Sequence, residues 1–213
     1  MCYSFKTSII SYTIGMCSAI FALCTNQVIL GLLILFYTQM QLSEALIWRG
    51  LDTKDMILNK IGTRLGQFFL PSHNIAIGIG ILLVAFSGIN LLPLAIGFFF
   101  YVLILFVYKN TKYDTATFPA NRSCRDKSCQ NHENRLKWPY PHEWYIFSFL
   151  ISILFLILFI EPIASKIFIG VFFILTFFAS LFIYPNSMGS VWCFSTAILA
   201  PFLVIVNYFL IQE

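Results

Sequence analysis

The feature that most constrains this chain is a series of long apolar runs that only hydrocarbon could solvate. Seven runs lie at 9–24, 28–48, 73–91, 94–108, 145–160, 167–184 and 191–210. Hydrophobic residues make up 59% of the 213 residues and charged residues 10%, against roughly 45–50% and 25% in soluble domains. A water-soluble core cannot absorb that much apolar surface, so the sequence predicts a protein embedded in a lipid bilayer.

The backbone requirement inside a bilayer decides between helices and strands. Within hydrocarbon every backbone N–H and C=O group needs an internal partner, so only α-helices and closed β-barrels cross a membrane. The apolar runs lack the alternation that is typical of barrel strands. We therefore expect an all-α fold with about seven spans, a single polytopic transmembrane helical bundle covering residues 1–213. Pro201 lies inside the last run, where it predicts a kink.

One further helix is expected between the second and third runs. Residues 53–70 place apolar side chains on one face and charged or amide side chains elsewhere. The apolar residues are Met56, Ile57, Ile61, Leu65 and Phe68. Pro71 predicts the end of this helix, and Ser72 the cap of the next one. The 53–70 segment is therefore expected to lie along the cytosolic membrane surface as an interfacial amphipathic helix.

The positions of the basic residues predict the orientation. With seven spans, twelve of the thirteen Lys and Arg residues fall on one side of the membrane, and Lys166 alone falls on the other. Cytoplasmic flanks retain positive charge during insertion. We therefore expect a cytosolic N-terminus, a C-terminus on the opposite side and a basic cytosolic loop at 109–144. The net charge of +4 then points to anionic lipid as the partner and not to nucleic acid.

The densest polar feature inside an apolar run lies in the second half of 28–48. Gln41, Glu44 and Trp48 share one face of the expected helix, and Glu44 lies about one turn from Arg49. An ionisable residue within a span is costly, which makes Glu44 a functional-site hypothesis. The alternative is that Glu44 pairs locally with Arg49 or extends toward the membrane surface.

Residues from two other runs are expected near Glu44 at the inner leaflet. His73 opens the third run on that side, and Trp192 and Cys193 open the seventh. These residues are candidates for ligand binding, and Glu44 and His73 are the candidate catalytic pair of a lipid-modifying enzyme. A zinc site made of Glu44, His73 and Cys193 is a further alternative. Against it, a histidine at a helix N-terminus is more often a cap or interface residue.

The loop at 109–144 contains a second group of metal-ligating residue types. These are Cys124, Cys129, His132 and His142. Their spacing matches no established zinc signature, so we expect no cofactor, with zinc at these residues as the alternative. In a reducing cytosol the two cysteines would not form a disulfide.

No motif of a known catalytic or channel class occurs in the sequence. It has no TVGYG filter, no G-x-x-x-x-G-K-[ST] loop and neither H-E-x-x-H nor G-x-S-x-G. The favoured interpretation is a non-enzymatic membrane component that binds lipid or a protein partner. The alternatives are the lipid-modifying enzyme and a small-solute transporter. A transporter path would need four polar residues on one line: Glu44, Asn90, Glu161 and Asn207.

Four short segments carry a resemblance to a known family. They are MCYSF at the start, MQLSEALIWRG at 40–50, LNKIGT at 58–63 and GSVWCF at 189–194. In these segments the chain resembles an uncharacterised family of multi-pass membrane proteins found in giant DNA viruses and some protists. The resemblance implies a membrane location, a viral origin and membrane or virion proteins as partners, without implying a chemistry. It marks residues that overlap the inner-leaflet candidates: Met40, Gln41, Glu44, Trp48, Arg49, Trp192 and Cys193.

Overall fold

The structure is a computed structural model that describes residues 4–84, 99, 102–103, 117–119, 136–137, 150, 162–183 and 188–212. This part contains five helices, namely α1 (Phe5–Cys24), α2 (Val28–Asp52), α3 (Met56–Val84), α6 (Ile163–Ile183) and α7 (Met188–Gln212). A short antiparallel pairing joins β1 (Phe118–Pro119) to β2 (Leu136–Lys137). The expected helical fold is confirmed. Helices α1, α2, α6 and α7 are long and apolar enough to cross a membrane, as in an integral membrane protein.

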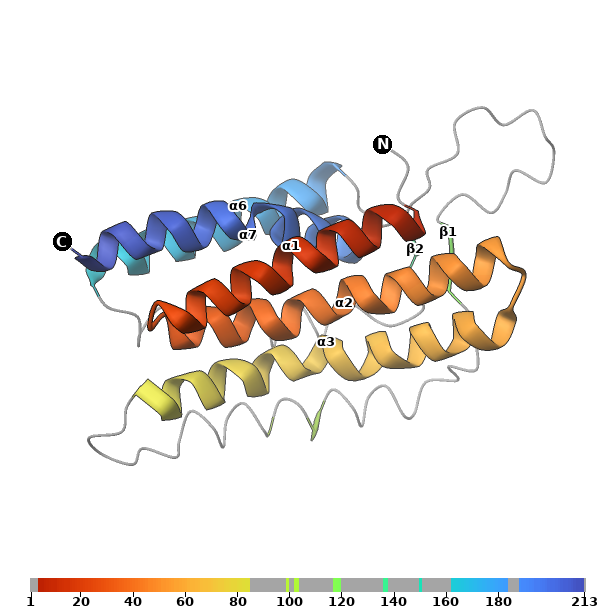
Figure 1. Cartoon of the computed structure of the whole chain (residues 1–213), viewed down its shortest axis with the longest axis horizontal. Coiled ribbons are helices and arrows are strands. Elements are labelled where there is room, and N and C mark those ends of the chain that lie inside the picture. The colour runs from red at the N-terminus through yellow and green to blue at the C-terminus, as the bar shows by residue number, and fades with distance from the viewer. Residues whose placement is uncertain are drawn as a thin grey trace.

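The helices run side by side, and the two termini lie at opposite ends of the bundle (Figure 1). Helices α1 and α2 form one antiparallel pair, α2 and α3 a second, and α6 and α7 a third. Ser4 caps α1 by accepting the Thr7 N–H at 3.2 Å. Asp55 begins α3 in the same way, because its Oδ1 accepts the N–H groups of Ile57 and Leu58. Both helices therefore start where a side chain satisfies their first free N–H groups.

Basic residues gather at the end of the bundle where α1 begins and α2 turns into α3, and we call this the basic end. Six of the seven Lys and Arg residues in the described part belong to it: Lys6, Arg49, Lys54, Lys60, Arg64 and Lys137. The seventh, Lys166, is near the start of α6, and α6 starts at the opposite end of the bundle (Figure 1).

Helix α3 differs most from the expectation, because it runs unbroken from Met56 to Val84 through Pro71. The predicted helix end at Pro71 is wrong, and so is the predicted cap, since Ser72 Oγ donates to the Phe69 carbonyl oxygen at 2.6 Å. The 53–70 segment is not a separate interfacial helix but the first half of a helix that packs along α2 (Figure 1). A proline is tolerated inside a helix where packing against neighbouring helices offsets the backbone hydrogen bond that it removes.

The apolar stripe predicted for 53–70 exists, and it faces away from the bundle. Ile57 is 73% exposed and Phe68 is 49% exposed. The opposite face of α3 packs on α2 so closely that a Cβ atom at Gly62 would lie 2.8 Å from the Ser43 carbonyl oxygen. Small residues permit such close approach of packed helices, and Gly62 is one of three glycines, with Gly50 and Gly80, that keep α2 and α3 close.

Replacing Gly62 should therefore force α2 and α3 apart. We expect Gly62→Leu to destabilise the protein by about 1–3 kcal/mol, the usual cost of overpacking. Thermal unfolding of the purified chain in detergent micelles measures this effect. The matched control is Ile61→Leu on the exposed face, for which a change within about 0.5 kcal/mol is expected. Equal effects of the two substitutions would contradict the close packing at Gly62.

The other helix bounds extend the predicted ones by a few residues. Helix α1 begins at Phe5, α2 continues to Asp52, α6 begins at Ile163 and α7 begins at Met188. Pro201 lies within α7 without ending it. The predicted spans at 94–108 and 145–160 and most of the basic loop lie outside the described residues.

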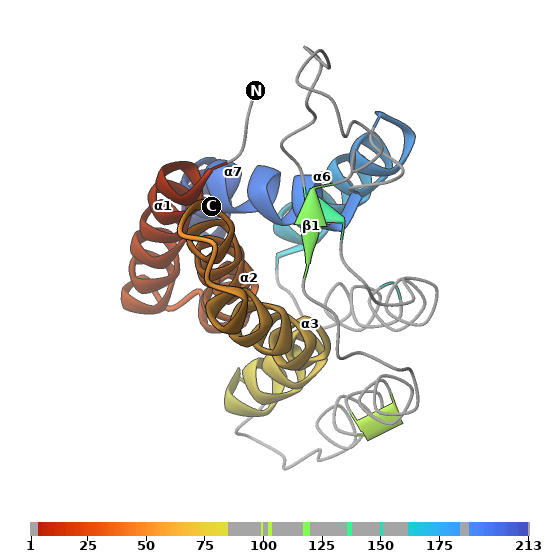
Figure 2. The same cartoon turned by 90° about the vertical axis from the view of Figure 1, so that its right-hand side faces the viewer.

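Helix α2 is the central helix of the described part. Seen end on, it lies among α1, α3 and α7 (Figure 2). In its most apolar stretch 67% of the residues are buried, against 33% in α1, α6 and α7. Polar residues on α2 are therefore shielded by protein on several sides, and they are the first candidates for a site.

Candidate functional site

Buried polar and aromatic side chains from four helices gather around the second half of α2. We call them the polar cluster: Ser11 from α1, Tyr37, Gln41, Glu44 and Trp48 from α2, His73 from α3, and Trp192 and Cys193 from α7. Each of them is at most 6% exposed. The cluster contains every ligand-binding candidate from the sequence except Arg49, together with Tyr37 and Ser11.

Tyr37 lies at the centre of the polar cluster. Its ring stacks on the His73 imidazole, with centroids 4.7 Å apart and planes 17° apart. It also meets the Trp192 indole edge-on at 5.2 Å. Trp192 in turn packs edge-on against Phe177 at 5.3 Å, and its Nε1 donates to Thr176 Oγ1 at 3.2 Å. This series of ring contacts joins α3, α2, α7 and α6, and each such pair adds to the packing energy.

Glu44 and Cys193 approach one another from α2 and α7. The thiol of Cys193 lies close enough to Glu44 and Tyr37 to interact with both side chains. Glu44 is 1% exposed and Cys193 is also 1% exposed. A buried acid, a thiol and a phenol thus lie together between two candidate membrane spans, where a charge is costly.

Helix α1 covers the other side of the cluster. Ser11 Oγ donates to Gln41 Oε1 at 2.6 Å, a direct hydrogen bond between α1 and α2. Arg49 is exposed, and its guanidinium carbon lies 5.6 Å from the centroid of the Phe5 ring. Arg49 is thus directed toward α1 by a cation–π contact, outside the polar cluster.

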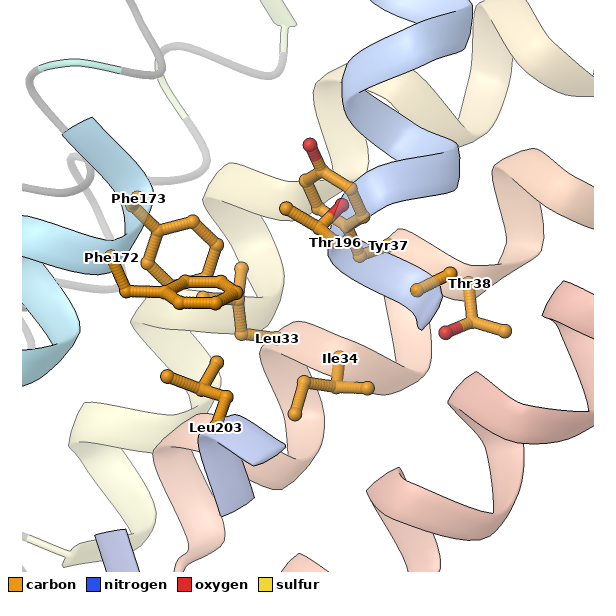
Figure 3. A pocket seen from close by; sticks show the side chains of 9 residues that line it. Leu33, Ile34, Tyr37, Thr38, Phe172, Phe173, Thr196 and Leu203 are labelled. Atoms are coloured by element: carbon orange, nitrogen blue, oxygen red, sulfur yellow. The ribbon is translucent and has the colours of Figure 1, made fainter. Parts of the chain in front are cut away.

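The cavity beside the polar cluster is small. It lies between α2, α6 and α7 and is bordered by Tyr37, Thr38 and Thr196 among others (Figure 3). Its volume is about 10 Å³. That is about the space one water molecule needs. Thr196 Oγ1 donates to the Trp192 carbonyl oxygen at 2.7 Å. A lipid headgroup does not fit there in this conformation.

Two side-chain donors of the cluster, Gln41 Nε2 and Trp48 Nε1, have no hydrogen-bond partner among the described residues. Within those residues no group of three or more His, Cys, Asp or Glu side chains could hold a metal ion. Glu44, His73 and Cys193 therefore do not form the zinc site considered from the sequence. The loop candidates for zinc lie outside the described residues: Cys124, Cys129, His132 and His142.

A second buried polar group fastens the strand pair to α3, and we call it the Asn59 clamp, made of Asn59, Thr63 and Thr117. Asn59 Nδ2 donates to the Thr117 carbonyl oxygen at 2.9 Å, and Asn59 Oδ1 accepts the Thr117 N–H at 2.9 Å. Thr63 Oγ1 lies 2.7 Å from Thr117 Oγ1. The asparagine amide thus pairs with the backbone as a neighbouring strand would. The sequence interpretation missed this clamp, because it placed Asn59 and Thr63 on the polar side of an interfacial helix.

A third polar group lies at the end opposite the basic end. Asn207 Nδ2 donates to Gln27 Oε1 at 2.7 Å, and Gln27 Nε2 donates to the Val204 carbonyl oxygen at 3.2 Å. These bonds hold the α1–α2 turn on α7. Asn207 is fourteen residues beyond Cys193 on α7, or about 21 Å along the helix. Asn207 is thus far from Glu44, and the other residues of the transporter path, Asn90 and Glu161, lie outside the described part.

Comparisons with known proteins do not place the chain in a family. No protein-family model, no curated protein and no solved structure matches it. The resemblance to the giant-virus family therefore stays a prediction.

Proposed function

We propose that the chain is a non-enzymatic, multi-pass membrane component that binds anionic lipid at its basic end. The separation of charge along the bundle carries this proposal. Asp52 and Asp55 are the exposed acids among the described residues of the basic end, so its six basic residues outnumber them. Lys and Arg near a membrane surface each contribute about 1 kcal/mol to the attraction of anionic lipid.

Seven spans with a cytosolic N-terminus belong to this proposal, and the path of the chain supports them. Helix α3 ends and α6 begins at the end opposite the basic end, whereas β1 and β2, which lie between them in sequence, are near the basic end (Figure 1). In this proposal the chain crosses the bundle once between α3 and β1 and once between β2 and α6. The apolar runs at 94–108 and 145–160 would supply these two crossings. The excess of positive charge supports a cytosolic location of the basic end.

In this proposal the polar cluster fixes the packing of the helices. Glu44 and His73, the candidate catalytic pair, are 1% and 0% exposed. Their neighbours are packed rings, and the adjoining cavity has room for about one water molecule. A lipid-modifying enzyme would need access from the membrane to this pair. The basic end, in contrast, presents Lys54 and Arg64 as exposed side chains.

Neutralising the basic end should weaken the binding of anionic lipid. For the double variant Lys54→Gln/Arg64→Gln we expect an affinity for phosphatidylglycerol lower by roughly tenfold to thirtyfold, because two contributions of about 1 kcal/mol are lost. Native mass spectrometry of the detergent-purified full chain, titrated with phosphatidylglycerol or phosphatidylcholine, measures this change. The effect should shrink as ionic strength rises.

Lys166→Gln provides the matched control, since it removes a positive charge at the opposite end of the bundle. We expect it to leave phosphatidylglycerol binding within about twofold, because a charge separated by the membrane thickness lies beyond the screening length. Equal affinity of the wild-type chain for phosphatidylcholine and phosphatidylglycerol would refute the proposal. Equal weakening by Lys166→Gln would refute the assignment to the basic end.

A further inference from the structure

Helices α1 and α7 enclose a groove on the outside of the bundle, distinct from the polar cluster and from the basic end. It has a volume of about 380 Å³, and Cys17, Phe21 and Ile205 are among the residues that line it. Ligand sites in proteins usually measure about 300–1,000 Å³. The groove is therefore large enough to hold part of a small molecule.

The lining of the groove selects for an apolar occupant. Its two hydroxyl side chains are already engaged, because Thr13 Oγ1 donates to the Ile9 carbonyl oxygen at 2.9 Å and Ser18 Oγ to the Ile14 carbonyl oxygen at 2.8 Å. Pro201, which also lines the groove, has no N–H group to donate. A polar occupant would give up its bonds to water without replacement, which is unfavourable.

The depth of the groove places it in hydrocarbon. With a rise of about 1.5 Å per residue, Cys17 lies about 18 Å from Phe5 and about 10 Å from Cys24 along α1. The hydrocarbon core of a bilayer is about 30 Å thick. The groove is thus closer to the end opposite the basic end, at the depth of the acyl chains of that leaflet.

A second copy of the chain is a poorer fit than a lipid. Close packing of membrane helices relies on small residues, and most of the small residues of α1 are buried in the bundle: Ser8, Ser11, Gly15, Ser18, Ala19 and Ala22. Gly15 is one example, since a Cβ atom there would collide with the Thr38 side chain. Two bulky side chains that line the groove are exposed, Phe21 at 44% and Ile205 at 48%. Such a lining suits a thin, flexible chain better than a helix.

We propose that the groove between α1 and α7 binds one acyl chain of a phospholipid from the leaflet opposite the basic end. Recognition is by shape and apolar contact, so the headgroup does not contribute. This site is independent of the proposed binding of anionic lipid, because occupancy should be the same for phosphatidylcholine and phosphatidylglycerol.

Photolabelling tests the site in nanodiscs that contain the full chain and phosphatidylcholine with a diazirine on one acyl chain. We expect adducts on residues 13–21 and 201–205 to be at least threefold more frequent than on the exposed side chains of α6, such as Leu175 and Phe182. Cys17 is exposed and lines the groove, so the larger ring in Cys17→Phe should occupy the groove. This variant should lower the number of adducts on 201–205 at least threefold. Cys24→Phe is the matched control, since Cys24 is also an exposed cysteine of α1 and does not line the groove.

Adducts spread evenly over α1, α6 and α7 in the wild-type chain would overturn the proposal, whether or not the variants fold. Equal loss of adducts in Cys17→Phe and Cys24→Phe would overturn it as well. Efficient cross-linking of two chains through Cys17 by a short bis-maleimide, together with weak lipid labelling, would instead assign the groove to a second copy. A dependence of labelling on headgroup charge would contradict recognition by the acyl chain.

Discussion

Trp192→Ala is expected to be among the most destabilising single substitutions in this chain, at about 3–5 kcal/mol, as for other large buried aromatic residues. Trp192 is 0% exposed and heads the largest fully buried side chains. Its indole packs edge-on against both Tyr37 and Phe177, and its N–H donates to Thr176. Removing the indole therefore leaves a cavity among α2, α6 and α7 that only a shift of whole helices could close.

Equilibrium unfolding in mixed micelles would measure this loss. Phe182→Ala is the matched control, because Phe182 is an aromatic residue of α6 that is 77% exposed, and a change below about 1 kcal/mol is expected there. Trp192→Phe should lie between the two, since it keeps a ring between Tyr37 and Phe177 and loses the bond to Thr176. If Trp192→Ala cost no more than Phe182→Ala, the polar cluster could not be what holds these helices together.

The helices could largely be predicted from the sequence, because long apolar runs in a chain with few charges leave the backbone little choice. Helices α1, α2, α6 and α7 follow from this argument to within a few residues. Helix α3 does not, because the expected break at Pro71 comes from a rule about isolated helices. In the structure α3 packs along α2 on both sides of Pro71, and this packing outweighs the loss of one backbone hydrogen bond.

The direction of the amphipathic face of α3 shows a second limit. The sequence interpretation placed the apolar stripe of 53–70 against the membrane surface and Asn59 and Thr63 on the polar side, away from the bundle core. Here Ile57 and Phe68 face outward, whereas Asn59 and Thr63 are buried. On α3 it is therefore small and polar residues, Gly62 among them, that define the side packed on the protein.

The candidate site was predictable within one helix and less so between helices. The face of α2 that carries Gln41, Glu44 and Trp48 follows from the helical repeat. The contacts of Tyr37 with His73 and of Ser11 with Gln41 depend on how far one helix is shifted along another. That shift is set by close contacts such as the one at Gly62, which local sequence patterns do not encode.

Asn59→Leu should release the start of the strand pair from α3. Leucine has a similar size but cannot bond to the N–H and C=O of Thr117, and each buried backbone group left without a partner costs about 1–3 kcal/mol. Thr63 Oγ1, 3.2 Å from the Thr117 nitrogen, can replace only part of the lost bonding. The Thr117 N–H and C=O each lose one partner in this variant. We therefore expect the free energy needed to expose the Thr117 amide to solvent to fall by about 2–4 kcal/mol.

Hydrogen exchange at the Thr117 amide, measured by mass spectrometry of the full chain in micelles, reports this opening directly. A loss of about 1.4 kcal/mol corresponds to tenfold faster exchange, so acceleration well above tenfold is expected for Asn59→Leu. Asn59→Asp should give a smaller acceleration, because one carboxylate oxygen still accepts the Thr117 N–H. Met56→Leu, on the exposed side of α3, should leave exchange at Thr117 unchanged. If the Thr117 amide exchanged in Asn59→Leu at the wild-type rate, the Asn59 clamp would not be what holds the strand pair to the bundle. The fully buried Leu136 would then hold it.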